Sequence, residues 1–170
     1  MQLASTRRRI QLFAIGLSVM VGSLIMNTPQ PTQAQSISPL PLMTCQGFLV
    51  TKIGTAGNDN IVGTAGNDVI AGLRGNDVIN GGGGNDIICG GDGHDAIRGG
   101  VGHDRVRGDA GSDSIFGEAG HDRLFGDADN DRIAGGDGND FVDGGSQTDT
   151  LDGGNHSDTC INGEFVLNCP

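Results

Sequence analysis

One aliphatic residue recurs at every ninth position between residues 54 and 161 of the chain. In twelve consecutive nonapeptides, the eighth residue is Ile, Val or Leu in eleven and Cys160 in the last. Side chains of a strand alternate between its two faces, so positions 7 to 9 predict a short strand with one inward aliphatic residue. The first six positions instead carry glycine and, in most units, an Asn-Asp, His-Asp or Ser-Asp pair, which predicts a tight turn.

Turn and strand alternate without insertion, which predicts an all-β fold. We expect two units to complete one coil, so that each unit stacks on the unit 18 residues later and the strands pair in parallel. The result would be a flattened β-solenoid of twelve repeats at residues 54–161. Residues 35–53 are expected to form an N-terminal linker and cap, and residues 162–170 a C-terminal cap.

The first 34 residues have the pattern of a secretory signal peptide. Arg7, Arg8 and Arg9 precede an apolar run at 10–26, and Ala34 follows as a small residue suited to cleavage. An uncleaved membrane anchor is the alternative, because the apolar run approaches the length of a short span. We expect cleavage, no stable membrane insertion afterwards, and a secreted protein, with retention at the cell surface or in the periplasm as the other destinations.

The composition is poor in large side chains and strongly acidic. The chain has 170 residues, of which 32 are Gly and none is Trp or Tyr, so an ordinary apolar core cannot be built. All acidic residues follow residue 58, and without the first 34 residues the net charge is 7 − 21 = −14. A nucleic-acid partner is therefore not expected, because phosphates require basic surfaces.

The units resemble the nonapeptide GGxGxDxUx of the RTX family, in which U is a large aliphatic residue. Units such as GGGGNDIIC and GGDGHDAIR carry this pattern, and all twelve units have Gly at position 1 and Asp at position 6. The resemblance implies a right-handed parallel β-roll with calcium ions between stacked turns. It also implies that the ligands are backbone carbonyls and twelve carboxylates, Asp59, Asp68, Asp77, Asp86, Asp95, Asp104, Asp113, Asp122, Asp131, Asp140, Asp149 and Asp158.

The aspartate columns indicate why such a roll would need a cation. Neighbouring strands lie about 4.8 Å apart, and two carboxylates at that distance repel by about 3 kcal/mol at an effective dielectric constant of about 20. Ca²⁺ accepts mixed carboxylate and carbonyl ligands, whereas Mg²⁺ needs a stricter octahedron. We expect folding to depend on calcium. Stacked turns that both keep Gly at position 4 number about seven of a maximum of ten, because Asp129, Gln147 and His156 replace it in the last units.

Four cysteines suit an oxidising compartment, and their spacing matches no zinc motif. Cys89 would face outward beside other apolar residues, where the segment 39–53 with Cys45 is the natural cover. The tail 161–170 can fold back over the last coil. We therefore expect disulfides between Cys45 and Cys89 and between Cys160 and Cys169, although the spacing alone permits three pairings.

Positions 7 and 9 of each unit are expected to face outward, and every second unit contributes to the same sheet. In the even-numbered units, these positions predict a cluster of basic and aromatic side chains on one sheet: Arg105, Arg107, Arg123, Phe125 and Phe141. Such side chains are enriched in binding hot spots. The cluster could bind an acidic or glycan partner, but ordinary strand surface with local charge balance is the simpler interpretation.

The sequence favours a secreted, non-enzymatic calcium-binding protein. His94, His103 and His121 occupy position 5, where other units have Asn, and no hydrolase motif accompanies them. A surface adhesion or envelope protein and an accessory module for a separate secreted enzyme are the alternatives. Ice binding is disfavoured because the outward threonines do not form a regular row.

Overall fold

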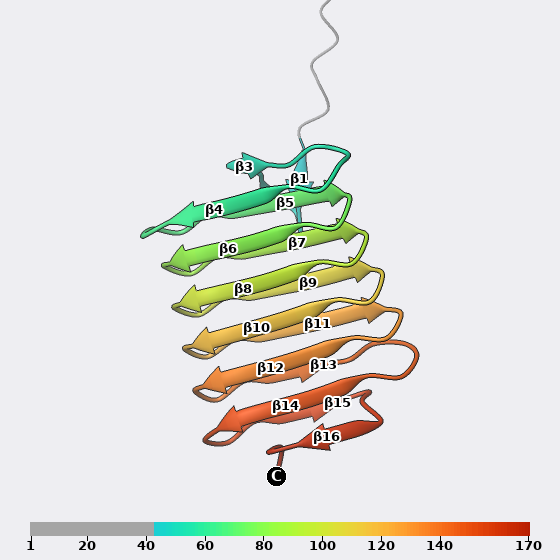
Figure 1. Cartoon of the computed structure of the whole chain (residues 1–170). Helices are drawn as coiled ribbons and strands as arrows, with labels where there is room; N and C mark the ends of the chain where they lie inside the picture. The colour runs from blue at the N-terminus through green and yellow to red at the C-terminus, as the bar shows by residue number, and fades with distance from the viewer. Residues whose placement is uncertain (1–42) are drawn as a thin grey trace, which may run out of the picture. The chain divides into compact units, whose positions relative to one another are not determined.

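A computed structural model describes residues 43–170, and the signal peptide expected at 1–34 lies outside the described residues. Residues 43–170 contain strands and turns but no helix. No helix in this range could therefore span a membrane. The strands follow one another down a regular stack of coils, from β3 at the top to β16 at the bottom (Figure 1).

The coils place two parallel seven-stranded sheets against each other. The first contains β4 (Asn60–Thr64), β6 (Val78–Gly83), β8 (Ala96–Val101), β10 (Ser114–Ala119), β12 (Arg132–Asp137), β14 (Thr150–Asn155) and β16 (Phe165–Leu167). The second contains β3 (Lys52–Ile53), β5 (Val69–Arg74), β7 (Ile87–Asp92), β9 (Arg105–Ala110), β11 (Arg123–Ala128), β13 (Phe141–Asp143) and β15 (Thr159–Ile161). A short antiparallel hairpin precedes them, formed by β1 (Thr44–Cys45) and β2 (Phe48–Leu49).

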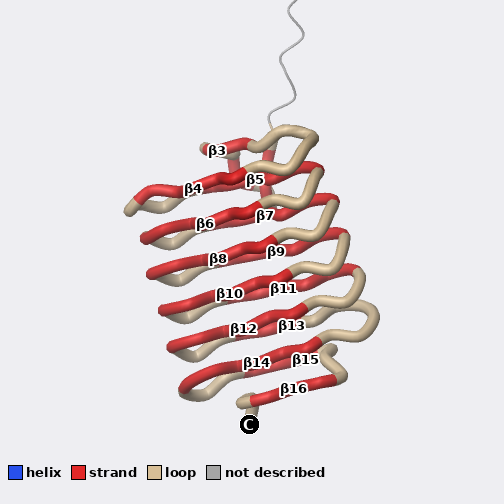
Figure 2. Tube along the Cα trace, viewed as in Figure 1, coloured by secondary structure: helices blue, strands red, loops and turns tan. Residues whose placement is uncertain are grey.

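Equivalent residues of every second unit lie side by side. Ile115 of β10, for example, pairs with Ile97 of β8 on one side and with Ile133 of β12 on the other. Figure 2 shows strand and turn alternating twice in each coil. This register of 18 residues confirms the parallel β-solenoid with two strands per coil.

The strands are longer than the three residues expected from the sequence. Most have six residues, because positions 1 to 3 of the next unit continue the strand. In β5, for instance, Leu73 and Arg74 at positions 2 and 3 pair with Gly91 and Asp92 of β7. The glycine at position 1 does not join the ladder, so the strand continues past an irregular residue that the sequence pattern assigned to the turn.

The interior holds one column of aliphatic side chains per sheet. Ten residues at position 8 are at most 1% exposed: Ile70, Ile79, Ile88, Ile97, Val106, Ile115, Leu124, Ile133, Val142 and Leu151. Ile61 and Cys160, at the two ends, are partly buried against this column. Strand β3 adds Lys52 above Ile70, so a charged residue closes the upper end of one column.

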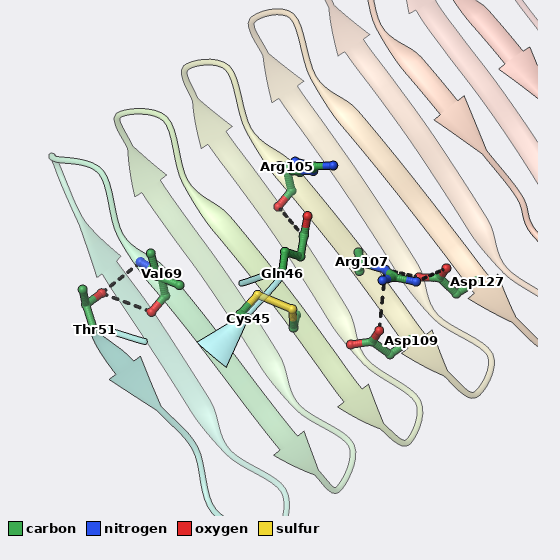
Figure 3. The surroundings of a disulfide bond; sticks show 9 residues. Cys45, Gln46, Thr51, Val69, Arg105, Arg107, Asp109 and Asp127 are labelled. Atoms are coloured by element: carbon green, nitrogen blue, oxygen red, sulfur yellow. Dashed lines mark hydrogen bonds and ion pairs between the residues drawn. A yellow bond between two sulfur atoms is a disulfide. The ribbon is translucent and has the colours of Figure 1, made fainter. Parts of the chain in front are cut away.

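Two disulfides join the caps to the coils, between the cysteines expected from the sequence. Cys45 is bonded to Cys89, which holds the β1–β2 hairpin against β7 (Figure 3). Cys160 of β15 is bonded to Cys169, which ties the C-terminal tail to the last coil.

Candidate metal-binding columns in the turns

The position-6 aspartates point into the roll rather than toward solvent. Eleven of them are at most 7% exposed: Asp68, Asp77, Asp86, Asp95, Asp104, Asp113, Asp122, Asp131, Asp140, Asp149 and Asp158. Asp59, in the first unit, is half-buried. They form two columns, one along each edge of the stacked coils, as the register of 18 residues requires.

In ten of the twelve aspartates, one carboxylate oxygen connects neighbouring coils. The backbone N–H of Asp95 donates to Oδ1 of Asp113 at 2.8 Å, and Asp113 N–H donates to Oδ1 of Asp131 at the same distance. The same bond repeats down both columns, from Asp59 to Asp158. At the lower end, Glu164 replaces the missing aspartate, because its Oε2 accepts the N–H of Asp149 at 2.6 Å. The sequence pattern did not single out Glu164, which lies outside the repeats.

The other oxygen has no partner. In ten aspartates, Oδ2 is buried and makes no hydrogen bond: Asp77, Asp86, Asp95, Asp104, Asp113, Asp122, Asp131, Asp140, Asp149 and Asp158. A buried ionised oxygen without a partner is strongly unfavourable, so each such atom needs a physical explanation. A cation beside the column would supply it.

Glycine at position 1 makes room for this oxygen. Position 1 follows the inward position 8 by two residues, so a side chain there would also point inward. A Cβ on Gly108 would overlap Oδ2 of Asp113 in the same unit, and it would lie 2.8 Å from the carbonyl oxygen of Gly126 in the next coil. The invariant glycine therefore keeps open the space where a carboxylate and a backbone carbonyl converge.

Carbonyl oxygens of the turns approach the next coil in the same way. A Cβ on Gly93 would overlap the carbonyl oxygen of Gly75, and a Cβ on Gly91 would overlap that of Leu73. Positions 2 and 4 both have positive φ in the ten units that begin with residue 72. Non-glycine residues occupy several of these positions, including Asp129, Gln147 and His156 at φ 77°, 78° and 87°. The last turns therefore keep the positive φ of position 4 without glycine, although the sequence count of well-formed sites left them out.

The first two turns are the irregular ones instead. Thr55 donates its backbone N–H and its hydroxyl to Oδ2 of Asp59, at 2.6 and 2.9 Å. Thr64 makes the same pair of bonds to Oδ2 of Asp68, at 2.7 and 2.8 Å. These two carboxylates are satisfied within their own turns, and threonine at position 2 is the sequence signal that distinguishes them.

Burial raises the pKa of most of these carboxyl groups. Desolvation is the largest cause, and repulsion from neighbouring carboxylates adds to it, against the lowering effect of the backbone hydrogen bond. It raises the pKa of Asp104 to about 6 and that of Asp113, Asp122 and Asp131 to about 7. The free-energy cost of ionising the aspartates therefore comes first from their burial. The sequence had suggested mutual repulsion as the main cause.

The histidines act as the asparagines do. Nδ1 of His103 accepts the backbone N–H of His121 at 2.7 Å, as Oδ1 of Asn85 accepts that of His103 at 2.9 Å. His94 and His121 accept the N–H groups of Ser112 and Asn139 in the same manner. Position 5 thus needs a side-chain acceptor that reaches the next coil, and both residue types provide it.

The basic and aromatic cluster expected from the sequence lies on one sheet face. Arg105 and Arg107 belong to β9, Arg123 and Phe125 to β11, and Phe141 to β13. Arg107 is ion-paired with Asp127.

Residues 43–170 contain no group of three or more His, Cys, Asp or Glu side chains suited to one metal ion. A cation between the turns would therefore need carbonyl ligands besides the carboxylates. A comparison with curated protein sequences gives no match. The family model for the RTX calcium-binding nonapeptide repeat matches residues 53–88, 68–97, 90–124, 98–133 and 125–160. These overlapping matches cover the stacked turns from end to end, and the chain belongs to the family of RTX calcium-binding nonapeptide repeat proteins.

Proposed function

We propose that the protein is a secreted calcium-binding protein whose β-roll folds when calcium binds between the stacked turns. The observation that carries the proposal is the set of ten buried Oδ2 atoms without hydrogen-bond partners. Each is a carboxylate oxygen beside a backbone carbonyl of the next coil, which is the type of oxygen-rich environment that Ca²⁺ prefers. The membership in the RTX family supports the same ion.

The ligands would come from two stacked turns at a time. The position-6 aspartates would contribute Oδ2, beside the position-1 carbonyl of the next coil. Carbonyls of positions 2 and 4 would complete the set of ligands. Bound calcium would neutralise the buried carboxylates and so remove the main cost of ordering the roll. One ion per orphaned oxygen gives up to ten sites, and the first two turns, satisfied by Thr55 and Thr64, are not counted among them.

Secretion is supported by the two disulfides, which persist in oxidising compartments. Calcium is also plentiful outside cells. We assign no catalytic activity to the protein, since the described clusters of titratable groups are explained by the stacking of turns.

Calcium titration of the purified protein tests the proposal. Circular dichroism should show little strand content in calcium-free buffer and full strand content after addition of Ca²⁺, whereas the same concentration of Mg²⁺ should have little effect. Isothermal titration calorimetry on the same sample should give several calcium ions per chain, up to ten. Full strand content in excess chelator would overturn the proposal.

A further inference from the structure

Two arginines of the second sheet lie next to each other without a counter-charge. Arg105 of β9 and Arg123 of β11 are direct partners in the parallel register, and both side chains are exposed. Neither forms an ion pair with any carboxylate in residues 43–170. Like charges directly opposite each other destabilise a sheet, so this arrangement is unfavourable by itself.

Three other arginines of the roll have an acidic partner. Arg74 is paired with Asp92, Arg98 with Glu118, and Arg107 with Asp127. Arg132 of β12 is also without an ion pair, but its register neighbours, Ser114 and Thr150, are uncharged. The residues that follow the first 34 carry a net charge of −14, so acidic groups are not scarce. The pair formed by Arg105 and Arg123 is therefore a local concentration of free positive charge on an acidic protein.

Aromatic rings continue the same row of outward positions. Phe141 of β13 is the register partner of Arg123, whose guanidinium lies 5.5 Å from the ring centroid. The ring of Phe125 lies 5.7 Å from that of Phe141, at an interplanar angle of 49°. Across three neighbouring strands, the row thus presents two cations and then an aromatic surface.

A residue of the N-terminal hairpin borders this surface on one side. Gln46 follows the disulfide-bonded Cys45 and reaches over the sheet, where its Nε2 donates to the carbonyl oxygen of Arg105 at 3.5 Å (Figure 3). An open depression of about 390 Å³ is lined by Gln46, Arg105, Arg107 and Phe125. Polar, cationic and aromatic groups therefore surround one shallow site.

We propose that this face binds a carboxylated polysaccharide along the row Arg105, Arg123 and Phe141. A guanidinium can hold a carboxylate with two parallel hydrogen bonds, and an aromatic ring can pack against the apolar face of a sugar. Strands are about 4.8 Å apart, close to the length of one sugar ring in an extended chain, so neighbouring strands can contact neighbouring rings.

The charge of the rest of the protein narrows the choice of ligand. A densely charged polyanion such as nucleic acid would be repelled by the acidic surface. A sugar chain with one carboxylate per ring has a lower charge density, and it offers ring faces to Phe125 and Phe141. An acidic peptide offers the carboxylates without those ring faces.

Binding of short oligogalacturonates to the calcium-loaded protein tests the proposal, measured by isothermal titration calorimetry. The double variant R105S/R123S should bind at least about ten-fold more weakly, because it loses two charge-assisted contacts. The matched control R98S/R132S removes the same charge from the opposite sheet and should bind like the unmodified protein. Neutral cello-oligosaccharides and a short polyglutamate peptide should bind far more weakly than oligogalacturonate.

Absence of oligogalacturonate binding would overturn the proposal, as would equal losses in the two double variants or equal binding of the polyglutamate peptide. The inference rests on the calcium-binding function only because calcium keeps the roll folded. Circular dichroism of the same samples distinguishes a failure of calcium-dependent folding from a failure of sugar binding. A sample that gains strand content with calcium but does not bind the sugar contradicts the glycan site alone.

Discussion

The backbone N–H of Asp95 donates a 2.8 Å hydrogen bond to Oδ1 of Asp113, which lies one coil further along the roll. Oδ2 of the same Asp113 is buried without a partner. One carboxylate oxygen therefore fixes the distance between two coils, and the other remains for a cation. The two oxygens can be tested separately, because an amide in place of the carboxylate keeps one acceptor and loses the charge.

Replacement of Asp113 by Asn should weaken calcium binding specifically. The amide oxygen can still accept the N–H of Asp95, but the anionic oxygen is lost. We expect D113N to bind about one calcium ion fewer and to lose about 3 kcal/mol of calcium-saturated stability, the size typical of breaking a buried charge interaction. Calorimetric stoichiometry and urea unfolding at saturating calcium measure the two effects.

Asp59 provides the matched control. Its Oδ2 already accepts the N–H and the hydroxyl of Thr55. D59N should therefore leave the calcium stoichiometry unchanged and cost about 1 kcal/mol or less, the value of ordinary hydrogen bonds. If D59N and D113N changed calcium binding equally, the distinction between satisfied and orphaned carboxylates would be wrong.

Acid should favour the calcium-free roll. Burial raises the pKa of Asp113, Asp122 and Asp131 to about 7, above the value in the unfolded chain. A raised pKa in the folded state gives a contribution to stability that is complete below the unfolded-state pKa and is lost as pH rises through the folded-state pKa. In calcium-free buffer, strand content should therefore increase as pH falls from about 8 to about 4.

With calcium present, the effect of pH on folding reverses, and acid disfavours the folded roll. The reason is that protons compete with the metal for the same carboxylates. The calcium concentration at half-folding should rise as pH falls over the same range. Circular dichroism at several pH values, with and without calcium, measures both trends. Strand content that decreases steadily with acid in calcium-free buffer would contradict the protonation of the buried columns.

The ninefold pattern predicted the coil, its register and the column of aliphatic residues, because each depends only on the spacing of one side chain. It did not predict the length of the strands. Positions 1 to 3 are rich in glycine and have the composition of a turn, yet Leu73 and Arg74 continue β5. The neighbouring coil decides this, since the ladder supplies hydrogen bonds that local propensity does not include.

The identity of the residue at position 4 was a poor guide to the conformation of the turns. Turns without glycine at position 4 were left out of the count of well-formed sites, but Gln147 and His156 adopt positive φ there. The ladder on either side fixes the backbone there and overcomes the local cost. Glu164 completes a carboxylate column from outside the repeats, so it had no periodic signal at all. The two predicted disulfides, in contrast, followed from which cap could cover which strand.

Replacement of Gly108 by Ala should prevent folding even with calcium. Its Cβ would overlap Oδ2 of Asp113 and lie 2.8 Å from the carbonyl oxygen of Gly126. We expect G108A to lose about 3 kcal/mol or more, the upper range for overpacking, and to show little strand content at calcium concentrations that fold the unmodified protein. Gly57 is the control, since a Cβ there meets only Oγ1 of Thr55 at 3.9 Å. G57A should stay within about 0.5 kcal/mol of the unmodified protein. If G108A were as stable as G57A, position 1 would not be crowded in solution.

The two disulfides should stabilise the roll by different amounts. Cys45 and Cys89 are 44 residues apart, whereas Cys160 and Cys169 are 9 apart. If the main effect is on the unfolded chain, the longer loop contributes about 4 kcal/mol and the shorter about 2.6 kcal/mol. The double variant C45S/C89S should therefore unfold at lower urea than C160S/C169S at the same saturating calcium.

C45S/C89S should still gain strand content with calcium, because the β1–β2 hairpin contributes no strand to either seven-stranded sheet. It should, however, bind oligogalacturonate more weakly, since Gln46 is no longer held over Arg105. A larger loss of stability from C160S/C169S would instead mean that the disulfides act mainly by stabilising the folded roll, at its lower end. There Cys160 packs against the aliphatic column and its bond to Cys169 covers the last coil.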